Sequence, residues 1–260
     1  MGGAPVGKTA GMTTSDPQVV RSGARAAWLL GAGLTAGWLG LLAWVRSTTP
    51  DVPPLDSGLH DWAVQVRTPE TIDLANAVSV LGQVDVAVPL AVVGVVLVES
   101  VTRRWGRARA AVGMALLAGG GVVVGLTMNH LVGRERPVPD AWAGAAGGPS
   151  FPSGHTTAAT VAALLLAWAV TRVVTRRRVQ VAVWVVAALW AVGVGWSRVW
   201  LGVHWPTDVL AAWLFVPSLL VLGRAAQLTW WPADAPPTSV LDPSTPSSPG
   251  TEPVYREVPR

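Results

Sequence analysis

Residues 151–174, FPSGHTTAATVAALLLAWAVTRVV, place the cluster Pro152-Ser153-Gly154-His155 directly before a long apolar run. The run is about 20 residues long, enough to span the hydrocarbon core of a bilayer as a helix. Histidine and arginine are costly inside a bilayer, so polar clusters at the ends of such runs indicate a site at the membrane surface. This stretch therefore predicts a membrane-spanning helix with a functional site at its N-terminal end.

Two further polar clusters lie at the ends of other apolar runs. Arg136-Pro137 follows one run, and Ser197-Arg198, His204 and Asp208 stand between two others. Together the clusters supply guanidinium groups that bind phosphate oxygens, two imidazoles and one carboxylate. This set of side chains is suited to phosphoryl transfer.

The composition favours a membrane protein. Hydrophobic residues make up 51% of the chain and charged residues 13%, whereas soluble domains contain about a quarter charged residues. We expect an all-α, polytopic protein with six transmembrane helices. The apolar runs cover residues 24–45, 84–101, 108–128, 156–174, 179–196 and 209–222.

The remaining segments are polar. We expect a disordered N-terminal segment over residues 1–23, a six-helix domain over 24–228 and a disordered Pro/Ser/Thr-rich tail over 229–260. Between the first two runs, a short amphipathic piece with Leu59, Trp62, Ala63 and Val66 is suited to lie on the membrane surface. The chain contains no cysteine, which excludes disulfides, thiol chemistry and cysteine-bound metals.

Basic residues alternate between the two sides of the predicted bundle. One side carries Lys8, Arg21, Arg25, Arg103, Arg104, Arg107, Arg109, Arg172, Arg176, Arg177, Arg178 and Arg224. The other side carries Arg46, Arg67, Arg134, Arg136 and Arg198. The positive-inside rule then predicts a cell-membrane protein with both termini in the cytoplasm and all three clusters on the outer face. The net charge of +4 is spread between apolar runs, so we do not expect nucleic-acid binding.

The three clusters resemble the signature of the type 2 phosphatidic acid phosphatase superfamily, which includes membrane lipid phosphate phosphatases and, more distantly, vanadium-dependent haloperoxidases. The resemblance covers about residues 84–222, and the second and third motifs match at every defining position. The first motif of the family is K-x6-R-P, and Asn129 stands at the position of its lysine. The resemblance implies a helical bundle of the phosphatase and haloperoxidase type.

The spacing of His204 and Asp208 supports a nucleophilic role for the histidine. In a helix, residues four apart project from one face. A carboxylate on one ring nitrogen fixes the tautomer and leaves a lone pair on the other. The resemblance implies that His204 attacks phosphorus and that His155 protonates the leaving oxygen and then activates water. The simpler interpretation, in which His204 and Asp208 only cap the last helix, does not require Ser197-Arg198 upstream.

The other candidate residues bind phosphate. Arg136 and Arg198 are the expected clamps, and Asn129 is expected to donate one hydrogen bond to a phosphate oxygen. At the start of a helix, Ser153 can cap the helix and donate to the phosphate, while Gly154 allows its backbone to approach the phosphate. Arg134 is either a third clamp or a lipid headgroup contact. No acidic cluster suited to Mg²⁺ accompanies these motifs, so we expect no cofactor and metal-independent hydrolysis.

The expected substrate is a lipid phosphate or diphosphate that reaches the site from the bilayer, such as phosphatidic acid, phosphatidylglycerol phosphate or an isoprenyl (undecaprenyl) diphosphate. Two alternatives stay open. The missing lysine would suit a catalytically weak or inactive phospholipid-binding protein of the same fold. A transporter would require paired broken helices or an inverted repeat, which the sequence does not show.

Overall fold

The computed structural model describes residues 17–49, 51–102 and 105–230. Every regular element in these ranges is helical. The elements are α1 (Pro17–Thr48), α2 (Pro54–Val66), α3 (Pro69–Val80), α4 (Val84–Thr102), α5 (Trp105–Val132), the 3-10 helix η1 (Pro139–Ala141), α6 (Gly154–Thr171), α7 (Arg177–Trp200) and α8 (Pro206–Trp230). The all-α prediction is confirmed.

The helix boundaries follow from local sequence signals. Proline stands at the first position of α2, α3 and α8, where its missing N–H removes no helical hydrogen bond. The Ser153 hydroxyl accepts a hydrogen bond from the backbone N–H of Thr156 and caps α6. Helix α7 ends at Trp200, and Gly202 follows it with a φ of +71°, the left-handed conformation that glycine adopts without steric cost.

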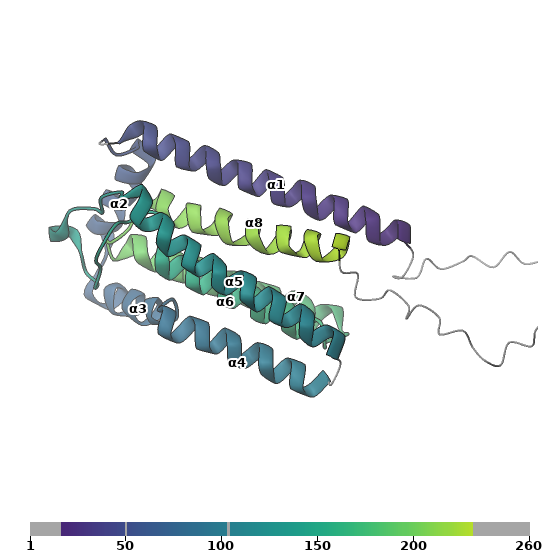
Figure 1. Cartoon of the computed structure of the whole chain (residues 1–260). Helices are drawn as coiled ribbons and strands as arrows, with labels where there is room; N and C mark the ends of the chain where they lie inside the picture. The colour runs from purple at the N-terminus through teal and green to yellow at the C-terminus, as the bar shows by residue number, and fades with distance from the viewer. Residues whose placement is uncertain (1–16, 50, 103–104, 231–260) are drawn as a thin grey trace, which may run out of the picture.

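Helix α6 is the centre of the bundle and packs against α4, α5, α7 and α8. Its small side chains, among them Ala158, Ala162 and Ala169, are almost fully buried. Helix α1 lies along α8 on the outside of the bundle (Figure 1). The long helices therefore enclose one core, and the helix that begins with Ser153-Gly154-His155 runs through its middle.

All six predicted apolar runs fall in long helices: α1, α4, α5, α6, α7 and α8. Among the described residues, four helices are long and apolar enough to cross a membrane, or five if α3 and α4 form one broken span with a 49° bend. In α5, the apolar segment Gly119–Val132 is shorter than these spans. Six helices of suitable position are present, and six complete spans stay a prediction.

The ends of the predicted domain differ slightly from the helix boundaries. Helix α1 begins at Pro17, so residues 17–23, which we expected in a disordered segment, belong to the first helix. Helix α8 continues to Trp230, two residues beyond the predicted domain end at 228. The remainder of both predicted terminal segments lies outside the described residues.

The long helices run up and down, so the basic and polar clusters separate to opposite ends. Arg21, Arg25, Arg172, Arg176 and Arg224 lie toward the end where α1 begins and α8 finishes (Figure 1). The opposite end carries α2, α3 and the connections α5–α6 and α7–α8. The structure thus reproduces the predicted partition of charge between two sides. Lys8, Arg103 and Arg104 lie outside the described residues.

Candidate active site

The three sequence clusters meet at the end of the bundle that carries α2 and η1. Arg136 lies in the connection after α5, and His155 is the second residue of α6. Arg198 lies in the last turn of α7, His204 precedes α8, and Asp208 lies in the first turn of α8. Three segments that are distant in sequence therefore contribute to one site.

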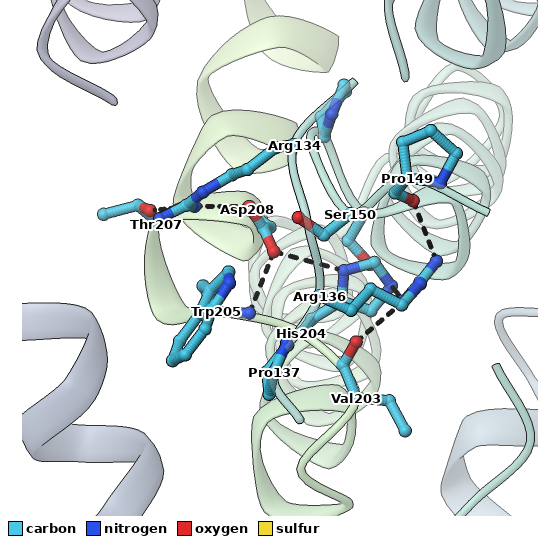
Figure 2. A network of polar contacts seen from close by, with 12 residues as sticks. Arg134, Arg136, Pro137, Pro149, Ser150, Val203, His204, Trp205, Thr207 and Asp208 are labelled. Atoms are coloured by element: carbon cyan, nitrogen blue, oxygen red, sulfur yellow. Dashed lines mark hydrogen bonds and ion pairs between the residues drawn. The ribbon is translucent and has the colours of Figure 1, made fainter. Parts of the chain in front are cut away.

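His204 is held between Asp208 and Arg136, as Figure 2 shows. Its Nδ1 lies 3.4 Å from Asp208 Oδ2, and its Nε2 lies 2.8 Å from Arg136 Nη1. A carboxylate only accepts hydrogen bonds and a guanidinium only donates them. Nδ1 therefore carries the proton, and the lone pair of the imidazole is on Nε2.

Burial keeps the His204 imidazole neutral. Only 1% of the residue is exposed, and this burial lowers the pKa of His204 to about 4, although Asp208 acts in the opposite direction and raises it. A charged imidazole loses its hydration when it is buried, which disfavours protonation. The predicted orienting role of Asp208 agrees with this geometry. His204 itself lies in the loop before α8, and its side chain reaches Asp208 from there.

Asp208 also stabilises the start of α8. Its Oδ2 accepts a hydrogen bond of 2.8 Å from the backbone N–H of Trp205. The capping interpretation is therefore correct as far as Asp208 is concerned, but it is incomplete. The same carboxylate contacts His204 and, through Oδ1, Arg134.

Arg136 is fixed by the connection between α5 and α6. Its Nη1 donates to the Val203 carbonyl at 2.7 Å and also faces His204 Nε2. Its other donors bind backbone carbonyls at 2.8–3.0 Å, those of Gly147, Gly148 and Pro149. Burial lowers the pKa of the Arg136 guanidinium, whereas Asp208 raises it. The connection between α5 and α6 thus holds the Arg136 guanidinium next to Nε2 of the candidate nucleophile, His204.

Arg198 reaches the same region from α7. Its Nη1 donates to Ser79 Oγ at 2.5 Å and its Nη2 donates to the Ala145 carbonyl at 3.0 Å. Its Nε is buried and has no hydrogen-bond partner. Arg198 is therefore anchored by α3, and one buried donor remains unused. The sequence did not identify Ser79, because a single serine in an apolar stretch carries no distinctive signal.

His155 lies within electrostatic range of the other candidate residues. Arg198, His204 and Arg136 all act on its imidazole. Gly82, in the turn between α3 and α4, packs against the backbone of His155, since a Cβ on Gly82 would lie 2.9 Å from the His155 carbonyl oxygen. The backbone N–H of the preceding Ser153 donates to the Asp208 carbonyl at 3.1 Å. These contacts join the second and third motifs directly.

The Asn129 side chain contacts the loop before α6. Its side-chain Nδ2 donates to the carbonyls of Pro149 at 2.9 Å and Pro152 at 3.2 Å. Both amide protons therefore support the loop that precedes α6. The amide lies beside the site without a free donor for phosphate in this conformation.

Arg134 is neither a free clamp nor a headgroup contact. It is 8% exposed and donates to two carboxylates at 2.6 Å, those of Asp208 and Asp56. Asp56 in α2 was not among the predicted site residues. Its only sequence signal is that it shares a helix face with His60 and Ala63, both also buried.

No group of three or more His, Asp or Glu side chains is placed to hold a metal ion within the described ranges. The guanidinium groups of Arg136 and Arg198 supply positive charge beside the two histidines. Metal-independent hydrolysis stays a prediction.

Comparisons with known proteins connect this geometry to a family. Residues 108–231 match the model of the PAP2 superfamily. The crystal structure of a transmembrane PAP2-type phosphatidylglycerolphosphate phosphatase from Bacillus subtilis superposes with a TM-score of 0.64 and 26% identity, covering 76% of this chain and 95% of that one.

Two curated relatives are similar over shorter segments. The undecaprenyl-diphosphatase of Sulfolobus acidocaldarius is 42% identical over 65 residues, which is 25% of this chain and 27% of the relative. The phosphatidylglycerophosphatase B of Escherichia coli is 41% identical over 86 residues, which is 32% of this chain and 29% of the relative. The chain thus spans less than a third of the length of either curated relative.

Proposed function

Because residues 108–231 belong to the PAP2 superfamily, we propose that this polytopic membrane protein is a phosphatase that hydrolyses a lipid phosphate or diphosphate. The reaction passes through a phosphohistidine on His204 and requires no metal. The phosphatase domain comprises residues 24–228. The observation that carries this proposal is the orientation of His204, with Nδ1 facing a carboxylate and Nε2 facing a guanidinium.

In the first step, Nε2 of His204 attacks phosphorus and the bond between phosphorus and the leaving oxygen breaks. Arg136 Nη1, which donates to Nε2 in this structure, transfers its hydrogen bond to a phosphate oxygen as the phosphoryl group takes its place. The leaving oxygen receives a proton from His155. Asp208 accepts a hydrogen bond from Nδ1–H throughout and stabilises the positive charge that develops on the ring.

In the second step, a water molecule attacks the phosphohistidine. His155, now neutral, takes one proton from this water, and the bond between phosphorus and Nε2 breaks. Phosphate and the original form of His204 result. Charge on the equatorial oxygens is spread over Arg136, Arg198 and the N–H groups at the start of α6, around Ser153 and Gly154.

The substrate class follows from where the site lies and from the relatives. The site is at one end of an apolar bundle, where a phosphate headgroup can enter while its tail stays in the bilayer. Related proteins are named for undecaprenyl diphosphate and phosphatidylglycerol phosphate. We place the site at the outer face, because the described basic residues gather at the other end.

The test is phosphate release by the purified protein from a panel of lipid phosphates, with and without EDTA. The panel contains phosphatidic acid, phosphatidylglycerol phosphate and an isoprenyl diphosphate. We expect release from at least one lipid, unchanged by EDTA, inhibition by vanadate, and complete loss in His204→Ala. Strict dependence on Mg²⁺ would contradict the metal-independent mechanism.

A second function, phospholipid binding with little or no turnover, is favoured by one observation. Asn129 stands at the position of the family lysine, and both of its amide protons bind backbone carbonyls. A hydrogen bond to a charged group contributes roughly 1.5–3 kcal/mol, so its loss slows a reaction by about one to two orders of magnitude. The expected protein is thus a slower phosphatase, not an inactive one.

We predict that Asn129→Lys raises or preserves the rate of phosphate release, because the longer cationic side chain can reach a phosphate oxygen. Asn129→Ala is the control, since it removes the loop hydrogen bonds without adding charge, and we expect it to lower the rate. An inactive wild type with an active Asn129→Lys variant would favour the binding protein. Inactivity of both folded proteins would contradict the catalytic proposal.

A further inference from the structure

A buried polar network lies behind the candidate nucleophile, on the side of its Nδ1 and away from Arg136. It joins Asp56 of α2, Arg134 of the α5–α6 connection, and Thr207 and Asp208 of α8. Arg134 Nη1 donates to Asp208 Oδ1 at 2.6 Å and Arg134 Nη2 donates to Asp56 Oδ2 at 2.6 Å. Figure 2 shows Arg134 reaching toward Asp208 and Thr207 from the loop.

Asp56 is more than a counter-ion for Arg134. Its Oδ1 accepts the backbone N–H of Thr207 at 2.8 Å, and its Oδ2 also accepts the Thr207 hydroxyl at 2.6 Å. Thr207 Oγ1 in turn accepts from Arg134 Nη1 at 2.7 Å. The residue beside Asp208 is therefore fixed to α2 through both its backbone and its side chain.

The burial of this network indicates a function other than stability. Asp56 and Asp208 are both 0% exposed. Ion pairs that lose their hydration contribute little net stability compared with apolar residues of similar size, whereas removal of one partner is very unfavourable. An arrangement of three buried charges is consistent with a requirement for defined geometry at Asp208.

The charges of this network also determine the electrostatic environment of the His204 imidazole. If Arg134 bound Asp208 alone, the two charges would cancel and the carboxylate would support the imidazole weakly. Asp56 adds a second negative charge, so the group Asp56–Arg134–Asp208 carries a net charge of −1. This charge faces the ring nitrogen Nδ1, which becomes part of a cation when Nε2 is phosphorylated.

We propose that Asp56 and Arg134 are positioning residues that hold Asp208 in place and keep a net negative charge behind His204. This inference rests on the proposed function of His204 as the nucleophile. Neither residue touches the phosphate. Short helix α2 is then part of the catalytic apparatus, although it lies outside the segment that matches the family model.

The opposite face of His204 meets only cationic or neutral groups among the described residues. Arg136 approaches from the α5–α6 connection, Arg198 from α7 and His155 from α6, and the first two both act to lower the His204 pKa. The negative charge on the Asp208 side therefore offsets the positive charge of these groups. A change at Asp56 or Arg134 alters this balance without altering the phosphate clamps.

Asp56→Asn and Arg134→Gln test the proposal. We expect kcat to fall about 100-fold in each variant, because a misplaced reacting group costs about this factor. We expect KM and vanadate inhibition to stay within about twofold of wild type. Asp61→Asn, on the exposed side of α2, is the matched control and should retain wild-type kcat, since 64% of its side chain is exposed.

The pH profile distinguishes positioning from a purely structural role. Asp56→Asn removes a negative charge near His204, which disfavours protonation of the imidazole. The acid limb of the kcat/KM profile of this variant should therefore move to lower pH. Arg134→Gln removes a positive charge, so its acid limb should move to higher pH. The double variant should lose less kcat than the product of the two single losses, because it leaves no unpaired buried charge from the pair.

Two milder variants cover the case in which Asp56→Asn or Arg134→Gln does not fold. Thr207→Ser retains the hydroxyl and should keep kcat within about threefold of wild type. Thr207→Val removes the hydroxyl and should lower kcat about tenfold with unchanged KM. Equal kcat in these two folded variants would overturn the proposal, as would wild-type kcat in Asp56→Asn.

A rise of more than tenfold in KM and in the vanadate concentration for half inhibition, with unchanged kcat, would show that Arg134 binds phosphate and would also overturn the proposal. These outcomes are distinct from a failure of the proposed function. If the proposed function fails, wild type and Asp61→Asn would both release no phosphate from any lipid in the panel. That result would overturn both proposals together.

Discussion

His204 must be neutral for the proposed reaction to start, so its pKa sets the lower limit of the pH range in which it can act as the nucleophile. Burial lowers its pKa from the ordinary value of 6.5 to about 4. As the pH falls, the lone pair on Nε2 is therefore retained until well below pH 6.5. We predict that protonation of His204 causes no loss of kcat/KM above about pH 5, beyond the effect of ionisation of the substrate itself.

The measurement is the pH profile of phosphate release between pH 4 and 8, with the ionisation of the lipid phosphate determined separately in the same micelles. A loss of kcat/KM caused by protonation of an enzyme group at or above pH 6.5 would contradict this assignment. The same pKa shift has a consequence for stability. Its stabilising contribution is complete above pH 6.5 and is lost as the pH falls toward 4, because the unfolded imidazole takes up a proton that the buried ring does not.

At the level of single residues, the sequence identified those site residues that lie close to one another along the chain. His204 and Asp208 are four residues apart, and Ser153 stands directly before an apolar run, so both arrangements were predictable. Asp56 and Arg134 are 78 residues apart, and their pairing depends on the packing of α2 beside the α5–α6 connection. No local pattern carries that information. The hydrogen bonds of Asn129 to the carbonyls of Pro149 and Pro152 were equally unpredictable, because these carbonyls approach it only in the folded loop.

Among the structural elements, the connection between α7 and α8 places His204, and Gly202 shapes it. A Cβ at this position would contact the Ala141 carbonyl oxygen, and φ is +71°. We predict that Gly202→Ala lowers the free energy of unfolding by at least about 1–2 kcal/mol, because L-residues are strained in the left-handed conformation. Phosphate release should fall as well, since Val203 and His204 follow immediately.

Thermal unfolding in detergent measures the effect of the substitution on stability. The kcat of phosphate release measures its effect on activity. Gly40→Ala in α1 is the control, because a Cβ there meets no atom within 4 Å. An alanine in an exposed helical position should leave the midpoint unchanged or slightly raised. A Gly202→Ala protein as stable and active as wild type would mean that this connection does not position His204.

Helix type and order were predictable because apolar runs of membrane length are continuous in sequence. The two short helices, α2 and α3, were less clear. The amphipathic piece with Leu59 and Trp62 was recognised and forms α2, but the same spacing was interpreted only as a surface feature. Its polar face, which contains Asp56 and His60, is the buried one. Helix α3 is not among the predicted apolar runs, although it supplies Ser79 to Arg198.

At the scale of the whole molecule, the orientation in the membrane can be tested with introduced cysteines, because the chain has none. Ala145 and Thr175 are exposed at opposite ends of the bundle. We predict that Ala145→Cys reacts with an impermeant maleimide added to intact cells and that Thr175→Cys reacts only after the membrane is permeabilised. The physical reason is the excess of basic residues at the end that contains Thr175.

Val203→Cys would be a poor reporter of orientation, because Val203 is fully buried. Unmodified protein without cysteine is the control for background labelling. Labelling of Ala145→Cys only after permeabilisation would place the site on the cytoplasmic side and would contradict the outer-face proposal. It would leave the arrangement of His204, Asp208 and Arg136 unchanged.

The packing of α1 against α8 brings the first and last described helices together along their length. The Trp28 indole donates to Thr229 Oγ1 at 3.1 Å, and Trp28 meets the ring of Trp230 edge to face. The two ends of the bundle domain are thus neighbours on the face opposite the active site. A circular permutant with these ends joined by a linker and new termini at Thr175 would keep every helix beside its present partners, which makes the active site independent of where the chain begins.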